Sequence, residues 1–225
     1  MAIDYFSLGY PLAGLRSYYA WPAREHMPQR FLALFQPERQ TQVLDLVGVT
    51  PDLILPESNH FEQRYPFPDS LTAASIEDMT PLRQRFPEIK LVCIGPGKLE
   101  FGDGTFDLVF CSAVLEHVGN KQKQRRFIAE ILRVGKAFFL TTPNRWLPLD
   151  FHTLLPLLHW LPQSQHQQIL SLLGKLFWAS TDNLNLLSAN RLRQHFPVSQ
   201  LVAIEPARLF GWPSKLIGYG LVGHV

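Results

Sequence analysis

The segment 106–118 constrains the fold of this chain more than any other part of its sequence. Residues 108–111 are consecutive and apolar, without the alternation of a strand that has one face in water. Such a run is typical of a strand in a parallel sheet that helices cover on both faces. The polar residues Ser112, Glu116 and His117 follow directly. Because open α/β sheets bind ligands at the carboxyl ends of their strands, the segment predicts a buried parallel strand with a candidate site at its end.

Similar apolar runs recur along the chain and alternate with helical patterns. The predicted strands of this part are 43–47, 71–76, 89–94, 106–112 and 137–141. The helical patterns around them are 24–35, 56–65, 80–86 and 121–134. Two later runs, 200–205 and 216–222, are predicted to pair antiparallel and bring the sheet to about seven strands. This alternation predicts right-handed βαβ units and a mostly parallel sheet.

After Pro143 the sequence changes to apolar and helical patterns. Residues 150–160 are predicted to be helical, and Ser164 is a predicted cap of the next helix. The apolar stripe expected on that helix consists of Ile169, Leu172, Leu173, Leu176 and Phe177. Ser188 is the predicted cap of a further helix that ends before Pro197.

Composition narrows the possible partners and compartments. The 225 residues, 46% of them hydrophobic, fit one α/β domain with a substantial core. The net charge is +2 and no basic run could track a phosphate backbone, which argues against nucleic acid as the main partner. The two cysteines, Cys93 and Cys111, lie in apolar runs and are predicted to be buried, reduced thiols. The eight histidines show no metal-ligand spacing, so no metal is predicted.

No secretory signal or membrane span is evident, so a cytoplasmic protein is expected. Residues 154–161 are apolar but too short to cross a bilayer. Core packing is the simpler interpretation of this segment. The alternatives are an apolar substrate pocket or peripheral contact with a lipid surface.

The region around the fourth predicted strand resembles a known family. A turn rich in glycine and aspartate at 99–105, the pair Phe106-Asp107, a hydrophobic strand and Leu115-Glu116-His117 follow one another. This order resembles class I S-adenosylmethionine-dependent methyltransferases and is most similar to their type 11 methyltransferase domain. The resemblance runs from about Thr41 to Trp160. It implies an α/β, Rossmann-like, doubly wound and mostly parallel sheet of seven strands, with a helical lid inserted after the fifth strand.

On this resemblance the chain is interpreted as a single methyltransferase-like domain, 1–225. Its expected parts are an N-terminal arm and helix, a cofactor-binding core, a helical lid, and a C-terminal helix with the last strands. Their ranges are 1–40, 41–143, 144–190 and 191–225.

The resemblance implies cofactor-binding residues after four strands. The turn after the first strand supplies Asp45 and Gly48, although Val47 and Val49 add bulk where the family is normally bare. The second strand is followed by an acid for the ribose hydroxyls, with Glu77 preferred to Asp78, and by Met79 beside the adenine. The remaining candidates are Gly95, Pro96 and Gly97 after the third strand and Ser112, Ala113 and Val114 after the fourth. Each has a structural alternative, a plain turn for Asp45 and Gly48 and a helix cap for one of the two acids.

Three side chains are candidates for the transfer reaction itself. His117 or His152 could act as the general base, and Asn144 could hold an acceptor hydroxyl or amine. A purely structural role remains the alternative for each of them. The expected activity is methyl transfer from S-adenosylmethionine to a small-molecule or lipid-linked acceptor.

Two other functions stay open at this point, a degenerate member that acts as a binding or scaffold partner and a protein that docks on a membrane surface. A nicotinamide dehydrogenase is disfavoured because Val47-Gly48-Val49 lacks the Gly-x-Gly-x-x-Gly fingerprint.

Overall fold

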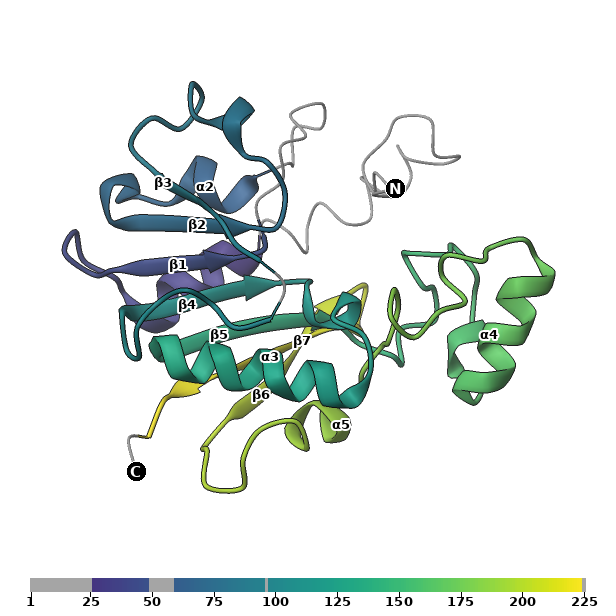
Figure 1. The fold of residues 1–225 in the computed structure, drawn as a ribbon. Helices are drawn as coiled ribbons and strands as arrows, with labels where there is room; N and C mark the ends of the chain where they lie inside the picture. Colours follow the sequence, from purple (N-terminus) through teal and green to yellow (C-terminus); the bar gives the residue numbers. More distant parts are fainter. Residues whose placement is uncertain (1–25, 49–58, 96, 224–225) are drawn as a thin grey trace.

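The computed structural model describes residues 26–48, 59–95 and 97–223. Its centre is a seven-stranded sheet in the order β3-β2-β1-β4-β5-β7-β6 (Figure 1). The strands from β1 to β5 are parallel, and β7 runs antiparallel to both β5 and β6. The bounds are β1 Val43–Leu46, β2 Leu71–Ser75, β3 Lys90–Cys93, β4 Phe106–Ser112, β5 Gly135–Pro143, β6 Ala203–Leu209 and β7 Trp212–Leu221. The predicted seven-stranded, mostly parallel, Rossmann-like sheet is confirmed.

The strand order contains a switch point between β1 and β4. From β1 the chain moves outward through β2 to β3 and then returns to place β4 on the other side of β1. The connections on either side of this boundary diverge, and ligands of open α/β sheets bind in the resulting crevice. The register aligns Asp45 with Phe110 in β4, and Leu46 with Ala74 in β2, so the two inner strands end at about the same level.

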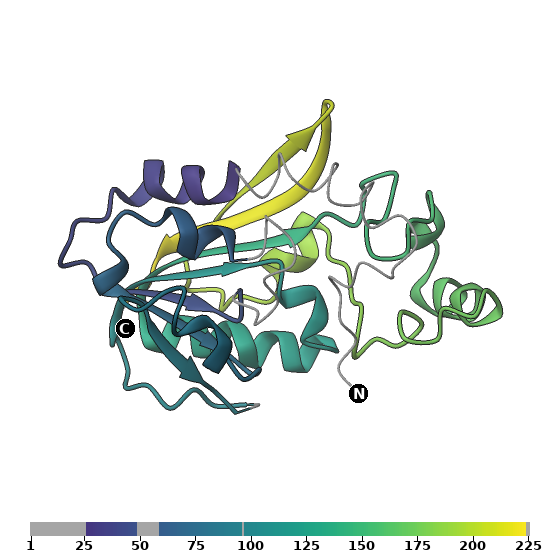
Figure 2. The ribbon, with the colours of Figure 1, turned by 90° about the horizontal axis from the view of Figure 1, so that it is seen from above.

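Helices cover both faces of the sheet. Figure 2 shows the helix of residues 26–35 on one face and α3 on the other. The remaining helices are short except for α4, and several connections contain a single turn of 3-10 helix. The bounds are α2 His60–Arg64, α3 Lys121–Val134, α4 Gln163–Leu172 and α5 Ala189–Arg193. The 3-10 turns are η1 Pro68–Ser70, η2 Thr80–Leu82, η3 Leu115–His117 and η4 Leu158–Trp160.

The helix α3 shows how local sequence sets an element in this fold. The Asn120 side chain accepts hydrogen bonds from the backbone N–H groups of Gln122 and Lys123, both at 3.0 Å, and so caps the first turn. At the other end, Gly135 is the C-cap residue and opens β5. Ile128 and Ile131 are almost completely buried against the sheet. The predicted bounds of this helix are confirmed.

An aromatic cluster fills the opposite face. The Phe31 ring lies edge-on to Phe61, Phe110 and Phe139, with centroids 5.5, 5.3 and 5.8 Å away. Edge-to-face contacts at such distances are favourable because the ring edge is positive and the ring face is negative. The helix of residues 26–35 is thereby fixed beneath β4 and β5.

Several local predictions differ from the structure. Residues 150–160 are not a helix, because Asp150 instead binds the backbone N–H groups of His152 and Thr153 in a turn, and only η4 is helical there. The expected helix over 80–86 is reduced to the 3-10 turn η2. Cys93 is exposed and only Cys111 is buried, because β3 is an edge strand with open faces.

The predicted apolar stripe of α4 is also wrong. Leu172, Leu173 and Leu176 are 87, 55 and 69% exposed, whereas His166 and Leu170 are the buried residues of this helix. The helix ends at Leu172, ahead of Gly174 with its left-handed φ of 72°, so the helical period does not continue to Leu176. Of the predicted lid, 144–190, residues 144–188 lie beyond the carboxyl ends of β4 and β5 (Figure 1), and α5 begins at Ala189. Their role as a lid stays a prediction.

Candidate functional site

The ends of β1 and β4 share an unusual backbone conformation. Val47 directly follows β1 and Ala113 directly follows β4, and their φ angles are 60° and 59°. The Val47 N–H donates to the Ala74 carbonyl at 2.7 Å, and the Ala113 N–H donates to the Thr141 carbonyl at 3.0 Å. The left-handed region is costly for residues other than glycine, most of all for a β-branched one. Two of the seven non-glycine residues with positive φ in the described part of the chain thus lie at the switch point, where a ligand is expected.

The strain at Val47 predicts an inverted order of two substitutions. Alanine is normally the more stable replacement, but at φ of 60° only glycine escapes the steric penalty. We expect Val47→Gly to be more stable than Val47→Ala by about 1 kcal/mol in urea unfolding. In the matched pair at Arg126, inside the helix α3, alanine should exceed glycine by about 1 kcal/mol. If Val47→Ala were as stable as Val47→Gly, or more stable, this account of the turn would be contradicted.

A buried pair of carboxyl groups lies beneath the same turn. Asp45 and Glu62 are 1 and 4% exposed. Within the described ranges, no group donates a hydrogen bond to the carboxyl oxygens of either residue. Burial, and then the neighbouring carboxyl of Glu62, raise the pKa of Asp45 well above its usual range. Gly48 is required here, because a Cβ at this position would lie 2.6 Å from Asp45 Oδ1. The predicted residues Asp45 and Gly48 are in contact, and sequence reasoning missed Glu62, which no local pattern connects to β1.

The two acids that follow β2, Glu77 and Asp78, make different contacts in the structure. Asp78 Oδ1 accepts hydrogen bonds from the Thr80 N–H at 3.0 Å and from the Thr80 hydroxyl at 2.6 Å. These bonds lower the pKa of Asp78 and close a local turn before η2, whereas the N-cap residue of η2 is Met79 and no side chain caps it. Glu77 is half-buried, and its N–H donates to Ser75 Oγ at 3.3 Å. The ribose contact therefore stays a prediction, with Glu77 as the better placed acid.

The other predicted cofactor residues differ in accessibility. Met79 is 3% exposed and packs in the core beneath the sheet, so its contact with adenine stays a prediction. Gly95 and Gly97 are exposed, Gly97 has a φ of 113°, and Pro96 lies outside the described residues. Past β4, the hydroxyls of Ser112 and Thr141 lie 3.0 Å apart, Ala113 is half-buried, and Val114 belongs to the core.

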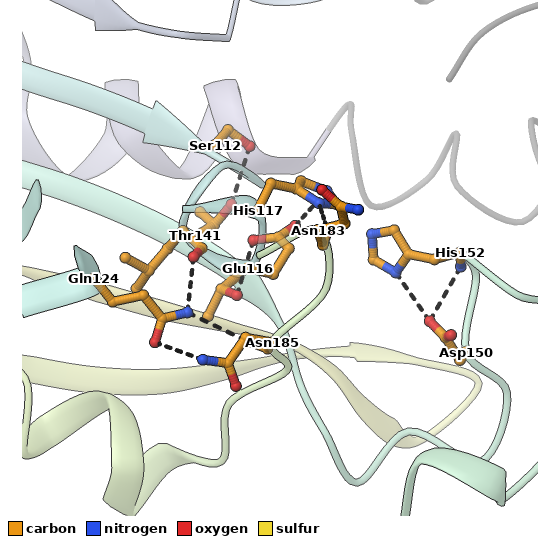
Figure 3. A network of polar contacts seen from close by, with 11 residues as sticks. Ser112, Glu116, His117, Gln124, Thr141, Asp150, His152, Asn183 and Asn185 are labelled. Carbon is orange, nitrogen blue, oxygen red and sulfur yellow. Dashed lines mark hydrogen bonds and ion pairs between the residues drawn. The ribbon is translucent and has the colours of Figure 1, made fainter. Parts of the chain in front are cut away.

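Three titratable side chains meet beyond the end of β4. Glu116 and His117 lie in η3, and His152 comes from the turn that Asp150 organises (Figure 3). One potential ligand atom from each of the three lies within 4.8 Å of those from the other two. The centroids of the two imidazole rings are 5.0 Å apart, and the Trp178 ring lies 6.2 Å from His117 and 5.2 Å from His152. The two predicted candidate bases thus share one site.

Glu116 is the least accessible member of this cluster. It is completely buried, and its Oε2 accepts a hydrogen bond from the Thr142 hydroxyl at 3.0 Å. The second oxygen, Oε1, has no hydrogen-bond partner in the described part of the chain and lies 3.9 Å from His117 Nε2. Burying a carboxylate that one hydroxyl holds costs free energy, so its presence here points to a partner of opposite charge.

Asp150 holds His152 in place. The buried carboxylate accepts hydrogen bonds from His152 Nδ1 at 2.9 Å and from the Thr153 hydroxyl at 2.7 Å. Burial works to raise the pKa of Asp150, but the His152 ring and these hydrogen bonds hold it well below the usual range. An ionised Asp150 accepts only, so Nδ1 carries the hydrogen and the lone pair of a neutral His152 lies on Nε2. A carboxylate that orients an imidazole in this way is the usual support of a general base.

Amides connect this site to α3. Gln124 Nε2 donates to the Leu115 carbonyl at 2.9 Å and lies 3.3 Å from the Asn185 carbonyl. Asn185 Nδ2 in turn donates to the Gly119 carbonyl at 2.8 Å, and Figure 3 shows Asn185 facing Gln124. These buried hydrogen bonds connect η3, α3 and the segment 144–188 to one another. Sequence reasoning missed Gln124, Asn185 and Asp150, because only the tertiary fold brings them to η3.

Asn144 has a structural engagement. Its Nδ2 donates to the Pro213 carbonyl at 3.0 Å, and its Oδ1 accepts from the Trp146 N–H at 3.2 Å. Both ends of the amide thus bind the backbone near the end of β5. An amide has two N–H donors and two acceptor lone pairs, so the predicted acceptor contact of Asn144 stays a prediction.

Comparisons with known proteins agree with the fold. Residues 66–137 match a family model described as a methyltransferase domain. No curated protein matches the sequence. Magnesium protoporphyrin IX methyltransferase from Synechocystis PCC 6803, solved with bound S-adenosylhomocysteine, is similar in structure, with 12% identity and a TM-score of 0.56 over 96% of this chain and 90% of that one.

Two further solved structures show the same likeness. A chain of the Haloferax volcanii complex between a methyltransferase activator and a putative methyltransferase has 11% identity and a TM-score of 0.56, with full coverage of both chains. A SAM-dependent methyltransferase from Aquifex aeolicus has 12% identity and a TM-score of 0.50 over 93% of this chain and 98% of that one. At such identities these likenesses establish the fold.

Proposed function

We propose that this chain, whose residues 66–137 match a methyltransferase domain, is a class I S-adenosylmethionine-dependent methyltransferase that methylates a small-molecule or lipid-linked acceptor bound beside Glu116, His117 and His152. The observation that carries the proposal is the meeting of these three side chains beyond the carboxyl end of β4. That position adjoins the switch point between β1 and β4, and open α/β sheets as a class bind ligands at such a point.

The cofactor is proposed to lie across the ends of β3, β2, β1 and β4. The predicted residues follow that spatial order: Gly95 and Gly97 after β3, Glu77 after β2, Gly48 after β1 and Ser112 at the end of β4. Glu77 would accept hydrogen bonds from the ribose hydroxyls, while the glycines would allow main-chain atoms to approach the nucleoside. The methyl group would then face the acceptor site.

The reaction is an in-line displacement at the methyl group of the sulfonium. The acceptor atom forms a bond to the methyl carbon, the carbon–sulfur bond breaks, and its electron pair stays on sulfur. Holding donor and acceptor in line can contribute roughly 7–11 kcal/mol to the lowering of the barrier. The Nε2 lone pair of His152, oriented through Nδ1 by Asp150, would accept the proton of an oxygen or nitrogen acceptor.

Exposed apolar side chains favour keeping lipid-linked acceptors in the proposal. Leu157 and Trp160 are 48 and 36% exposed in the segment 144–188, and the exposed leucines of α4 and its end lie in the same segment. Exposed large apolar side chains of this kind are available for contact with an apolar ligand or surface. Within the part of the chain that the structure describes, no helix has the length and apolar character needed to cross a bilayer.

Mass spectrometry and calorimetry test the proposed function. The purified chain is expected to carry adenosyl compounds, and S-adenosylhomocysteine should bind and raise its thermal stability. At 100 times the dissociation constant, a ligand of the folded state adds about 2.7 kcal/mol. Phenols, thiols and lipid-linked alcohols supplied with labelled S-adenosylmethionine would then identify the acceptor class. Absence of both heat and stabilisation at millimolar ligand would favour a scaffold protein instead.

A further inference from the structure

The hydrogen bonds at Nδ1 settle which nitrogen of each imidazole carries the lone pair. His117 Nδ1 lies 2.8 Å from the Asn183 carbonyl, which can only accept, so Nδ1 is the donor. His152 Nδ1 donates in the same way to Asp150 at 2.9 Å. In the neutral rings both lone pairs are therefore on Nε2, and Figure 3 shows the His152 ring turned toward His117. A carbonyl or carboxylate behind Nδ1 is the usual outer support of a histidine that binds a metal through Nε2.

The carboxylate of the cluster completes a set of three ligand atoms. Glu116 Oε1 is buried, has no hydrogen-bond partner in the described ranges, and lies 3.9 Å from His117 Nε2. A cation at this point would supply the charge that the buried carboxylate lacks. The second oxygen is already fixed by Thr142, so the orientation of the group is set in advance.

We propose that Glu116, His117 and His152 bind one divalent first-row transition metal ion, with Zn²⁺ as the reference ion. Two imidazole nitrogens and one carboxylate oxygen form the three-ligand set of open zinc sites, in which a fourth position remains for water or substrate. The same set disfavours Mg²⁺ and Ca²⁺, which take oxygen ligands almost entirely.

The geometry needs only a small contraction. Zinc bonds of about 2.1 Å in a tetrahedron place ligand atoms roughly 3.4 Å apart. The atoms of this cluster lie within 4.8 Å of one another, and the Glu116–His117 separation of 3.9 Å is already close. Most of the movement falls on His152, which a turn carries rather than a strand or helix.

The consequence for catalysis, unlike the binding itself, rests on the proposed function. In the metal form the imidazoles are ligands instead of bases, so the ion would take over the activation of the acceptor. An acceptor hydroxyl in the fourth position would have its pKa lowered and would release its proton to water. Glu116, His117 and His152 would hold the ion, which would supply Lewis-acid activation of the acceptor, and the electron pair of the breaking carbon–sulfur bond would stay on sulfur.

Titration of the metal-stripped full chain tests the site. Zn²⁺ followed by calorimetry, and Co²⁺ followed by its visible absorption, should each show one ion per chain, whereas Mg²⁺ should give no heat. We expect Glu116→Gln and His152→Ala to weaken Co²⁺ binding at least ~100-fold and Asp150→Asn to weaken it ~10-fold, the smaller effect of an outer support. His26→Ala removes an exposed histidine of the helix 26–35 and should leave binding unchanged.

The same protein preparations provide the controls for correct folding and for cofactor binding. Glu116→Gln keeps an acceptor for the Thr142 hydroxyl. It therefore tests whether the negative charge of Glu116 is needed for metal binding, even if His152→Ala lowers the thermal stability of the protein. Binding of Co²⁺ that is weak in the wild type, or equally reduced by His26→Ala, would overturn the metal site. S-adenosylhomocysteine binding is measured in parallel. If S-adenosylhomocysteine binds but the metal does not, only the metal site is contradicted. If the metal binds but S-adenosylhomocysteine does not, only the proposed function is contradicted.

Discussion

Replacing Glu77 with alanine is expected to weaken S-adenosylhomocysteine binding by ~10- to 100-fold, because hydrogen bonds to a charged group contribute about 1.5–3 kcal/mol. Glu77 follows β2, next to the switch point, at the position where the fold offers an acid to the ribose. The carboxylate would accept from both ribose hydroxyls and so fix the sugar. Isothermal titration calorimetry of the two proteins measures the difference directly.

Asp78→Ala is the matched control for this prediction. Asp78 is adjacent and carries the same charge, but its carboxylate already binds the N–H and hydroxyl of Thr80. We expect its replacement to change the affinity for S-adenosylhomocysteine by less than ~3-fold, because its carboxylate serves the local turn and not the cofactor. Equal effects of the two substitutions on affinity would mean that the ribose lies elsewhere.

Replacing Asp45 with asparagine is expected to stabilise the fold at neutral pH. The carboxyl of Asp45 is buried beside Glu62 without a geometric hydrogen bond in the described ranges. Asparagine has the same shape and no charge, so the repulsion and most of the desolvation cost disappear. Burying a charge costs more than burying a neutral amide, and we expect a gain of about 1–3 kcal/mol in the free energy of unfolding at pH 7. Urea unfolding measures it.

The pH dependence gives this prediction its sign. The pKa of Asp45 is raised in the folded protein, by burial first and by Glu62 second, so the folded state binds the proton more tightly than the unfolded chain. Its contribution to stability is present below the unfolded pKa of about 3.9 and is lost as the pH rises toward the folded pKa. The gain from Asp45→Asn should therefore grow between pH 4 and pH 8 and vanish at the acidic end.

Two substitutions isolate the cause of this gain. Glu62→Gln removes the partner carboxyl and should act in the same direction. Asp69→Asn changes an exposed aspartate that forms an ion pair with Arg39 and should leave stability almost unchanged. A gain from Asp45→Asn that is constant with pH would show that the buried charge is not its source.

Local sequence was sufficient for the elements whose signals are local. The apolar run of β4 and the pattern of α3 are complete within their own segments, so both were predicted with the bounds that the structure has. The same logic failed for the leucines at the end of α4. Periodicity indicates an apolar face, but it does not say whether another part of the fold covers that face, and here Leu172 is 87% exposed.

The sequence by itself determined the α/β class, the seven strands and the chain positions that end at the ligand edge, because hydrophobic burial and turn chemistry act over a few neighbouring residues. Only the tertiary structure decided which side chains meet there. Glu62 reaches Asp45, and His152 reaches Glu116 and His117, from segments far apart in the chain. Those meetings follow from how strands and helices pack, and the electrostatics of the site exist only once packing has removed water from it.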